Sequence, residues 1–343
     1  MSFKQFDNED VVVSADAISS TVWSTGNYTL STFHSSSTQE ASTSGDYYLS
    51  VYQTGSTDTT AAVQFSIAFG DKDGRGGSLF NSNVTGKSPT STVYGQYRSL
   101  ILGDEESDFN FSGINSNFGI FAISIDRARY KEKLMPGTFN LTLKSGSVEL
   151  KLTDDSNLAT TVNFTDAGRI FEVISGSNGT SFDGGTGITT TNGSYGKFLP
   201  DIGVIILNGQ AIRGTFEGGF GGTTLTRFAS GSNETSDGIN NRAMYSLISG
   251  SANAFSINAE ETVSSNFVFV RVRNGEFNYS NNPSNISGSG ELRHNSMVNN
   301  PQAYITSVGL YNDTNDLVAV AKLSKPLLKD FTKEALIRIK LDY

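Results

Sequence analysis

A pattern of two β-prone runs separated by turn-forming residues constrains the fold of this chain most, and it is clearest near the C-terminus. Residues 304–311 and 317–323 are apolar and rich in strand-favouring side chains, and they flank a cluster of Asn, Asp and Thr at 312–316. Those short polar side chains hydrogen-bond their own backbone and tolerate left-handed torsions. The pattern therefore predicts a β-hairpin.

The last predicted strand, residues 334–341, alternates between two faces. Ile337 and Ile339 fall on one face, and Arg338 and Lys340 fall on the other. Chain ends usually fray. A terminus with so strong a strand pattern is predicted to be held in a sheet or by a partner.

Composition favours strands and turns over helices. Charged residues make up 17% of the chain, well below the ~25% of an average soluble protein. The Ser, Thr, Asn and Gly that replace them make poor helix interiors. We predict a mainly all-β fold with antiparallel β-sandwich-like domains, an extended N-terminal arm, a C-terminal β-hairpin plus strand, and little helix. Residues 138–152 are the clearest tight hairpin, and residues 237–248 are the best helix candidate.

Three regions are predicted along the chain. They are an N-terminal arm at 1–45, a central β-rich region at 46–265 that could form two subdomains, and a C-terminal attachment module at 266–343. The arm is polar with isolated aromatic residues, which is typical of a segment that needs another surface for burial. Trp23 is its predicted anchor, because one indole can bury a large apolar area. An independent N-terminal domain is the alternative.

Several classes of protein are disfavoured by the totals. The formal net charge of -9 argues against nucleic acid, whose phosphates call for a basic surface. The chain has no cysteine, which excludes disulfides and thiolate metal sites. No apolar run approaches the ~20 residues of a membrane helix, so no membrane insertion is expected. Residues 1–10 lack the apolar core of a signal peptide, and we expect synthesis in a cytoplasm.

The sequence offers little chemistry for catalysis. The two histidines, His34 and His294, do not sit on recognisable turns beside a nucleophile. Adjacent carboxylates such as Asp154 and Asp155 point to opposite faces of a strand and make no glycosidase pair. Metal-ligand spacing of His or Cys is absent. We therefore predict no enzyme, no catalytic residue, no metal and no cofactor.

Two segments are candidates for contacts with other proteins. Arg127, Arg129, Lys131 and Lys133 form a dense basic patch. It is either a charged strand end with Asp126 and Glu132 as partners or a docking patch for an acidic neighbouring subunit. Residues 276–283 are aromatic and amide-rich, as expected of a strand that leaves its own sheet to lie along another surface.

Five stretches resemble a known family when they are taken together in order. They are residues 88–98, 127–137, 197–208, 276–283, and 304–313 continuing through 322–326. In this order they resemble virion structural proteins of T-even-like contractile-tailed bacteriophages of marine and cyanobacterial hosts. The similarity spans residue 90 to the end, with a looser match over residues 6–23. The pattern of residues 305–320 is similar to a hairpin of tail-fibre attachment and baseplate proteins, and the resemblance implies no catalytic residues.

The resemblance and the strand patterns predict a structural subunit of a bacteriophage virion, most simply a baseplate or tail component. It would be multi-copy or homo-oligomeric and act on other virion proteins by strand addition and arm exchange. Lys322, Lys325, Lys329 and Lys333 are expected to supply a basic face. A head or neck decoration protein and a glycan-binding adhesin, the latter suggested by loops such as 192–195, are the alternatives. The predicted interface residues are Trp23, Arg127, Arg129, Tyr130, Lys131, Phe277, Tyr279, Tyr304, Tyr311, Leu323, Ile337, Ile339 and Tyr343.

Overall fold

The computed structural model describes residues 4–35, 48–55, 57–76, 88–188, 191–219, 228 and 239–342. Strands make up 43% of the structure and helices 15%, and the strands are mostly antiparallel. The predicted mainly β fold with little helix is therefore confirmed. The chain forms two compact units: unit 1 comprises residues 1–17 and 262–343, and unit 2 comprises residues 18–261.

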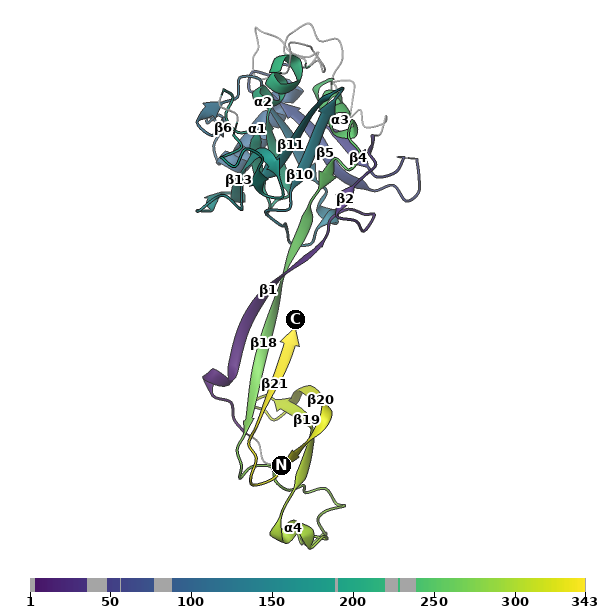
Figure 1. The fold of residues 1–343 in the computed structure, drawn as a ribbon, viewed down its shortest axis with the longest axis vertical. Helices are drawn as coiled ribbons and strands as arrows, with labels where there is room; N and C mark the ends of the chain where they lie inside the picture. Colours follow the sequence, from purple (N-terminus) through teal and green to yellow (C-terminus); the bar gives the residue numbers. More distant parts are fainter. Residues whose placement is uncertain are drawn as a thin grey trace. The chain divides into compact units, whose positions relative to one another are not determined.

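Unit 2 is built on one large curled sheet (Figure 1). Its strands follow one another in the order β2 (Thr29–Leu30), β17 (Phe255–Ser256), β10 (Asn140–Ser145), β11 (Val148–Asp154), β13 (Gly168–Ser177), β15 (Gly196–Leu199), β16 (Val204–Asn208), β8 (Ile120–Ile125), β5 (Val63–Gly70), β4 (Leu49–Tyr52) and β3 (His34–Ser35). Two short strands, β12 (Asn163–Thr165) and β14 (Thr180–Ser181), also pair with β13. The remaining short strands of this unit are β6 (Asn110–Phe111), β7 (Ile114–Asn115) and β9 (Lys133–Leu134).

The middle of this sheet is apolar on successive strands. Ile123 on β8 pairs with Ile205 on β16 and with Ile67 on β5, and all three side chains are fully buried. The hairpin predicted at residues 138–152 is confirmed as β10 and β11, which pair in register from Asn140 to Ser145. Gly146 occupies its turn with a positive φ of 58°, which glycine adopts without steric cost.

One face of the sheet carries the larger hydrophobic core. Trp23 makes edge-to-face ring contacts with Phe65 and Phe255, at centroid distances of 6.3 and 5.0 Å. Helix α3 (Ile239–Ser249) contacts both β10 and β5. Because those strands lie far apart in the strand order, the sheet must curl around this core. The helix predicted at 237–248 is thus confirmed over its described part.

The opposite face carries a smaller core covered by α1 (Pro89–Leu102). Tyr94 and Ile101 of this helix are buried in one cluster with Leu199 and Ile206 of the sheet. The sequence analysis did not identify this helix, although Ser88 caps it and a proline occupies its first turn. A further helical segment of the unit is α2 (Gly209–Arg213), which continues as a wider turn over Gly214–Gly219.

Unit 1 contains long strands and a short helix, α4 (Ser296–Asn299). Its part of β18 (Asn258–Val272) pairs antiparallel with β21 (Ala335–Asp342), from Ser265 opposite Asp342 to Val272 opposite Ala335. β1 (Val11–Thr21) lies on the other side of β18 in the strand order. The predicted hairpin is confirmed as β19 (Ala303–Tyr311) and β20 (Leu317–Lys329), and the predicted final strand is confirmed as β21.

The turn of this hairpin has the chemistry that the sequence indicates. The Asn312 side-chain carbonyl accepts hydrogen bonds from the backbone N–H of Thr314 and of Asp316, at 3.1 and 2.7 Å. Asn315 has a positive φ of 66°. The turn is therefore fixed by side-chain to backbone bonds and by a residue that tolerates the left-handed region.

Residues 276–283 do not form the extended strand that the sequence analysis expects. They belong to a turn-rich loop in which Phe277 has a φ of 53° and Asn278 is buried. The loop closes on Lys329, whose fully buried Nζ donates to the carbonyls of Asn274 and Asp330 and to Oδ1 of Asn278, at 2.9, 2.9 and 2.7 Å. A buried ammonium needs such acceptors. These hydrogen bonds stabilise the turns of the loop.

The predicted N-terminal arm divides between the two units. Residues 4–17 of the described chain belong to unit 1, and the segment from Ile18 onward belongs to unit 2. Trp23 is only 2% exposed and its indole N–H donates to the carbonyl of Tyr28 at 3.1 Å. The expectation that Trp23 anchors an arm on a partner is corrected, because this ring is part of the core of unit 2.

Candidate functional site

Unit 1 has almost no apolar core of its own. Among the described residues it buries the apolar side chains of Val268, Val272 and Ile339 only. It leaves a much larger set of apolar side chains exposed: Phe6, Val11, Val12, Val13, Phe277, Tyr279, Val298, Tyr304, Tyr311, Leu317, Val318, Val320, Phe331 and Leu336. Such an excess of exposed over buried apolar surface is typical of an interaction module rather than of an independent domain.

The β19–β20 hairpin shows this excess most clearly. Leu317 and Val318 lie on β20 at a register shift of the hairpin, where Val318 is the extra residue, and they are 53% and 69% exposed. Leu317 lies opposite Tyr311 of β19, which is also exposed. The apolar side chains at this end of the hairpin are therefore left largely exposed within the described chain.

A groove of about 500 Å³ runs between β20 and β21 in unit 1. It is lined by Leu310, by residues 319–325 and by residues 337–341. β21 is the last strand of its sheet and β20 belongs to a separate two-stranded sheet, so within the described residues each strand presents an unpaired backbone edge. Unpaired edges are templates for an added strand.

The charged side chains along this groove are mainly basic. Lys322 and Lys325 make no ion pair within the described chain, and Lys340 bonds Asp342 at 3.0 Å. Arg338 and Lys340 lie over the ring of Phe267, at 5.5 and 6.0 Å from its centroid. The predicted basic face must be corrected at Lys329, which is buried rather than on this surface.

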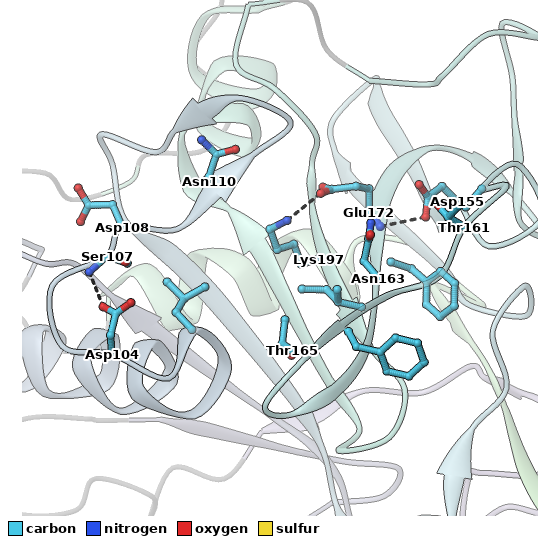
Figure 2. Close-up of a pocket in the computed structure, with 15 residues that line it drawn as sticks. Asp104, Ser107, Asp108, Asn110, Asp155, Thr161, Asn163, Thr165, Glu172 and Lys197 are labelled. Atoms are coloured by element: carbon cyan, nitrogen blue, oxygen red, sulfur yellow. Dashed lines mark hydrogen bonds and ion pairs between the residues drawn. The ribbon is translucent and has the colours of Figure 1, made fainter.

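A second groove, in unit 2, is polar and has a volume of about 500 Å³ (Figure 2). Its floor carries Glu172 of β13 and Lys197 of β15, which are directly opposite in the strand register and form an ion pair of 2.7 Å. Asp155, just after β11, accepts a hydrogen bond from the backbone N–H of Glu172 at 2.9 Å. Burial raises the pKa of Asp155 above its usual range.

Two loops form the walls of this groove. Figure 2 shows Asp104 and Asp108 on one side of the Lys197–Glu172 pair, and Asn163 and Thr165 on the side of β12. Asp104 follows the end of α1 and accepts the backbone N–H of Ser107 at 2.5 Å. Its pKa is lowered, first by hydrogen bonding to the Ser107 side chain and then by that backbone bond.

The glycine that ends α1 allows the loop after α1 to lie close to the β12–β13 turn. Gly103 has a φ of 74°, and a side chain there would clash with the Asp166 carboxylate of the β12–β13 turn. Phe164 of β12 also lines the groove and is 72% exposed. The site thus combines an exposed aromatic ring with carboxylate, amide and hydroxyl groups.

The predicted basic patch is engaged within unit 2. Lys131 bonds Glu261 at 3.0 Å and Lys133 approaches Glu260 at 3.5 Å, and both glutamates lie on β18. Arg127 stacks on the ring of Tyr130 at 4.6 Å. These contacts favour the charged-strand-end alternative, although the acidic partners of the two lysines come from β18.

The remaining members of this patch differ in exposure. Asp126 caps the short turn that begins at Arg127 by accepting the backbone N–H of Ala128 at 2.8 Å. Tyr130 is 6% exposed and is part of the core of unit 2, so it is corrected as a partner contact. Arg129 is half-buried, and its Nε has no hydrogen-bond acceptor among the described residues.

The C-terminal predictions fall on the exposed surface of unit 1 with two exceptions. Phe277, Tyr279, Tyr304 and Tyr311 are exposed, and Leu323 and Ile337 are half-buried beside the β20–β21 groove. Ile339 is 5% exposed and is corrected, because it faces the small core of this unit. Tyr343 lies outside the described residues.

The sequence analysis missed the polar groove altogether. The one available signal was Glu172, a charged residue inside the apolar run of residues 169–174. Its cross-strand partner Lys197 and the carboxylate of Asp155 come from distant parts of the chain, and only the strand order brings them together. A glutamate in a central strand indicates that one face of the sheet is locally left open to water.

No group of three or more acidic or histidine side chains that could hold a metal ion occurs among the described residues. In the described parts of the chain, no helix has the length and apolar character needed to cross a bilayer.

No protein-family model, curated protein or solved structure matches this chain.

Proposed function

We propose that this chain is a structural subunit of a bacteriophage virion, in or on the tail or baseplate of a contractile-tailed phage, and that unit 1 is its assembly module. The observation that carries the proposal is the imbalance in unit 1 between three buried apolar side chains and the exposed apolar set on its strands. The phage context rests on the resemblance of five sequence stretches to virion structural proteins. It assigns the chain no enzymatic activity.

Burial in an assembly would remove this apolar surface from water. Interfaces of permanent complexes resemble a domain core cut in two, with apolar and aromatic side chains at their centres. Tyr304, Tyr311, Leu317, Val318 and Val320 supply such a set from β19 and β20. Unit 2 is stabilised by burying apolar side chains within one chain. Unit 1 would gain the same kind of stabilisation only when subunits bind one another.

The mechanism proposed is strand addition at the β20–β21 groove. An extended segment of a neighbouring subunit would pair with the open backbone edges, and the side-chain alternation would set its register. The lysines and Arg338 along the groove favour an acidic segment. The chain as a whole carries a net charge of -9, so another copy of the same chain could supply such a segment.

The test is a pair of charge substitutions on the exposed face of β20. Val318→Asp with Val320→Asp changes two side chains of β20 that are 69% and 60% exposed. We expect the doubly substituted chain to fold, to lose self-association in light scattering, and to be absent from purified particles. Leu100→Asp, at a 46% exposed position on α1 in unit 2, is the matched control and should assemble normally.

Two outcomes would overturn the proposal. One is incorporation of the double variant at the wild-type level. The other is a wild-type chain that stays monomeric and is missing from the virion. Gold labelling of the protein on negatively stained particles separates the tail proposal from the head or neck alternative, because the label would then appear at the tail end or on the head.

A further inference from the structure

We infer that the polar groove of unit 2 is a binding site for a neutral saccharide, which goes beyond the assembly role proposed for unit 1. A sugar ring presents an apolar C–H face and a rim of hydroxyl groups that each donate and accept hydrogen bonds. A site for it needs an aromatic surface next to several polar groups that are not already bonded. The groove brings these features together from β12, β13, β15 and the loops after α1 and β11.

The aromatic surface is Phe164. It lies between Asn163 and Thr165 on β12, which pairs with β13 through Asn163 opposite Ile170 and Thr165 opposite Gly168. This pairing fixes the short strand, yet 72% of the Phe164 side chain is exposed. A ring held on a paired strand loses little conformational freedom when a ligand packs on it.

The polar groups include several with hydrogen-bonding capacity left over. Asp155 uses Oδ1 to accept the Glu172 N–H, and its other carboxylate oxygen makes no hydrogen bond to the described chain. The side chains of Asn163 and Thr161, both of which line the groove, also make none there. Figure 2 shows these three labelled residues on the same side of the Lys197–Glu172 pair. Asn163 and Phe164 are neighbours on β12, so their side chains leave opposite faces of that strand. An oligosaccharide that packs one ring on Phe164 can bond these polar groups through the hydroxyls of its other rings.

The charges of the groove exclude anionic ligands. Asp104, Asp108, Asp155 and Glu172 line it, against Lys197 as a basic group. Lys197 is already bonded to Glu172, so a carboxylate, sulfate or phosphate would find no free cation and several carboxylates nearby. Uronic acids, sialic acids and nucleotides are therefore disfavoured.

A basic peptide fits the groove less well than a neutral sugar. Two of the four carboxylates are ion-paired, Glu172 with Lys197 and Asp108 with Lys72, each at 2.7 Å. Burial raises the pKa of Asp155, which favours its neutral form over the charged form that a cation would require. Asp104 is then the one carboxylate of the four with neither an ion pair among the described residues nor a raised pKa, so the groove attracts a cation weakly, whereas hydroxyl partners stay available.

The experiment is a titration of the full chain with defined oligosaccharides, followed by ligand-observed NMR and calorimetry. The probes are cellohexaose, maltohexaose and chitohexaose as neutral sugars, hexagalacturonate as an anionic sugar and pentalysine as a basic peptide. We expect at least one neutral hexasaccharide to bind with a Kd of about 1 mM or tighter. No binding by any neutral probe, or tighter binding of hexagalacturonate or pentalysine, would overturn the inference.

Two substitutions locate the site and separate it from general effects. Phe164→Ala is expected to weaken saccharide binding about tenfold, as loss of one aromatic contact predicts. Phe182→Ala, at a 61% exposed ring of the same unit that does not line the groove, is the control and should bind normally. Equal binding by wild type and Phe164→Ala would also overturn the inference. Phe164→Ala should leave particle incorporation intact. A negative result for saccharide binding would therefore overturn the binding site without affecting the proposed assembly function.

Discussion

Unit 2 and unit 1 are both β structures, but they are stabilised in different ways. Unit 2 packs an apolar core on each face of one curled sheet and buries most of its large apolar side chains in them. Unit 1 holds its strands by backbone pairing, by the Asn312 turn and by the buried ammonium of Lys329, while only three of its described apolar side chains are buried and many are exposed. One chain can thus combine a domain that has its own apolar core with a module that leaves much of its apolar surface exposed.

The two units should therefore respond differently to the same chemical change. In unit 2, removing an apolar side chain leaves a cavity in the isolated chain. In unit 1, the same change at an exposed position removes surface that was already in water, so under the proposed function the loss would appear only on assembly. Trp23 is the single tryptophan of the chain and lies in the core of unit 2, which makes its fluorescence a specific probe of that unit.

The largest effect is expected in the core of unit 2. Phe255 is fully buried and packs against Trp23, Phe65 and Phe139. Phe255→Ala should lower the free energy of unfolding by about 3–5 kcal/mol, since it removes a large buried ring. Urea denaturation followed by Trp23 emission measures this loss.

Val318→Ala in unit 1 provides the matched comparison. At 69% exposure its effect on the isolated chain should stay within about 0.5 kcal/mol, as measured by hydrogen exchange of the β19–β20 amides. A loss of stability at Val318 comparable to that at Phe255 would contradict the difference between the two units, because Val318 would then be buried within the chain.

The next largest effect is expected at Lys329. Replacing it by Met keeps the length of the side chain but leaves the carbonyls of Asn274 and Asp330 and the amide of Asn278 without their donor. Buried acceptors that lose a charged partner should destabilise the loop by about 2–3 kcal/mol. Hydrogen exchange should show lost protection over residues 274–278, while Trp23 emission stays native.

Lys325→Met is the control for this loop prediction. Lys325 is exposed, lies in the same strand and makes no ion pair among the described residues. The substitution should leave exchange in the loop unchanged. If Lys329→Met also leaves it unchanged, the buried ammonium is not what holds unit 1 together.

Local patterns predicted the strands of both units well. The turn at 312–316, the alternation of Ile337 and Ile339 with their basic neighbours, and the hairpin around Gly146 all depend on residues close in sequence. Such elements are specified by backbone torsion preferences and by the periodicity of apolar residues along the sequence. The mainly β fold follows from the same local signals.

Features that depend on strand order could not be predicted. Trp23 looks like a free aromatic in a polar segment, and only the pairing of β17 with β2 and β10 brings Phe255 against it. Lys329 looks like one of several surface lysines until the 274–278 loop closes over it. The polar groove likewise requires β13 and β15 to be neighbours. Long-range register decides all three, and period alone carries no such information.

A smaller effect is expected from pH on unit 2. Asp154 is fully buried, and this burial raises the pKa of its carboxyl above the usual 3.8. A raised folded-state pKa contributes stability that is present below 3.8 and is lost as pH rises through the raised value. Asp154→Asn cannot ionise, so it should remove about 1 kcal/mol of this loss at neutral pH.

Urea denaturation between pH 4 and pH 8, followed by Trp23 emission, measures this difference. Asp183→Asn is the control in the same unit, because the pKa of Asp183 is lowered, chiefly by its bond to the Ser181 hydroxyl. The control should retain the wild-type decline as pH rises. An unchanged decline in Asp154→Asn would show that other groups carry the pH dependence of unit 2.

The smallest effect is expected from pH on unit 1, and it has the opposite sign. Hydrogen bonds from the Ser265 hydroxyl and then from Lys340 hold the pKa of Asp342 below 3.8. The Ser265 bond, 2.6 Å long, ties β18 to β21. A lowered folded-state pKa contributes stability that is present above 3.8 and is lost as pH falls through the lowered value.

Asp342→Asn should therefore reduce the loss of β18–β21 amide protection between pH 6 and pH 3, and Ser265→Ala should do the same by removing the donor. If protection declines equally in wild type and both variants, this carboxylate does not link the two strands, and the pairing of unit 1 depends on its backbone hydrogen bonds alone.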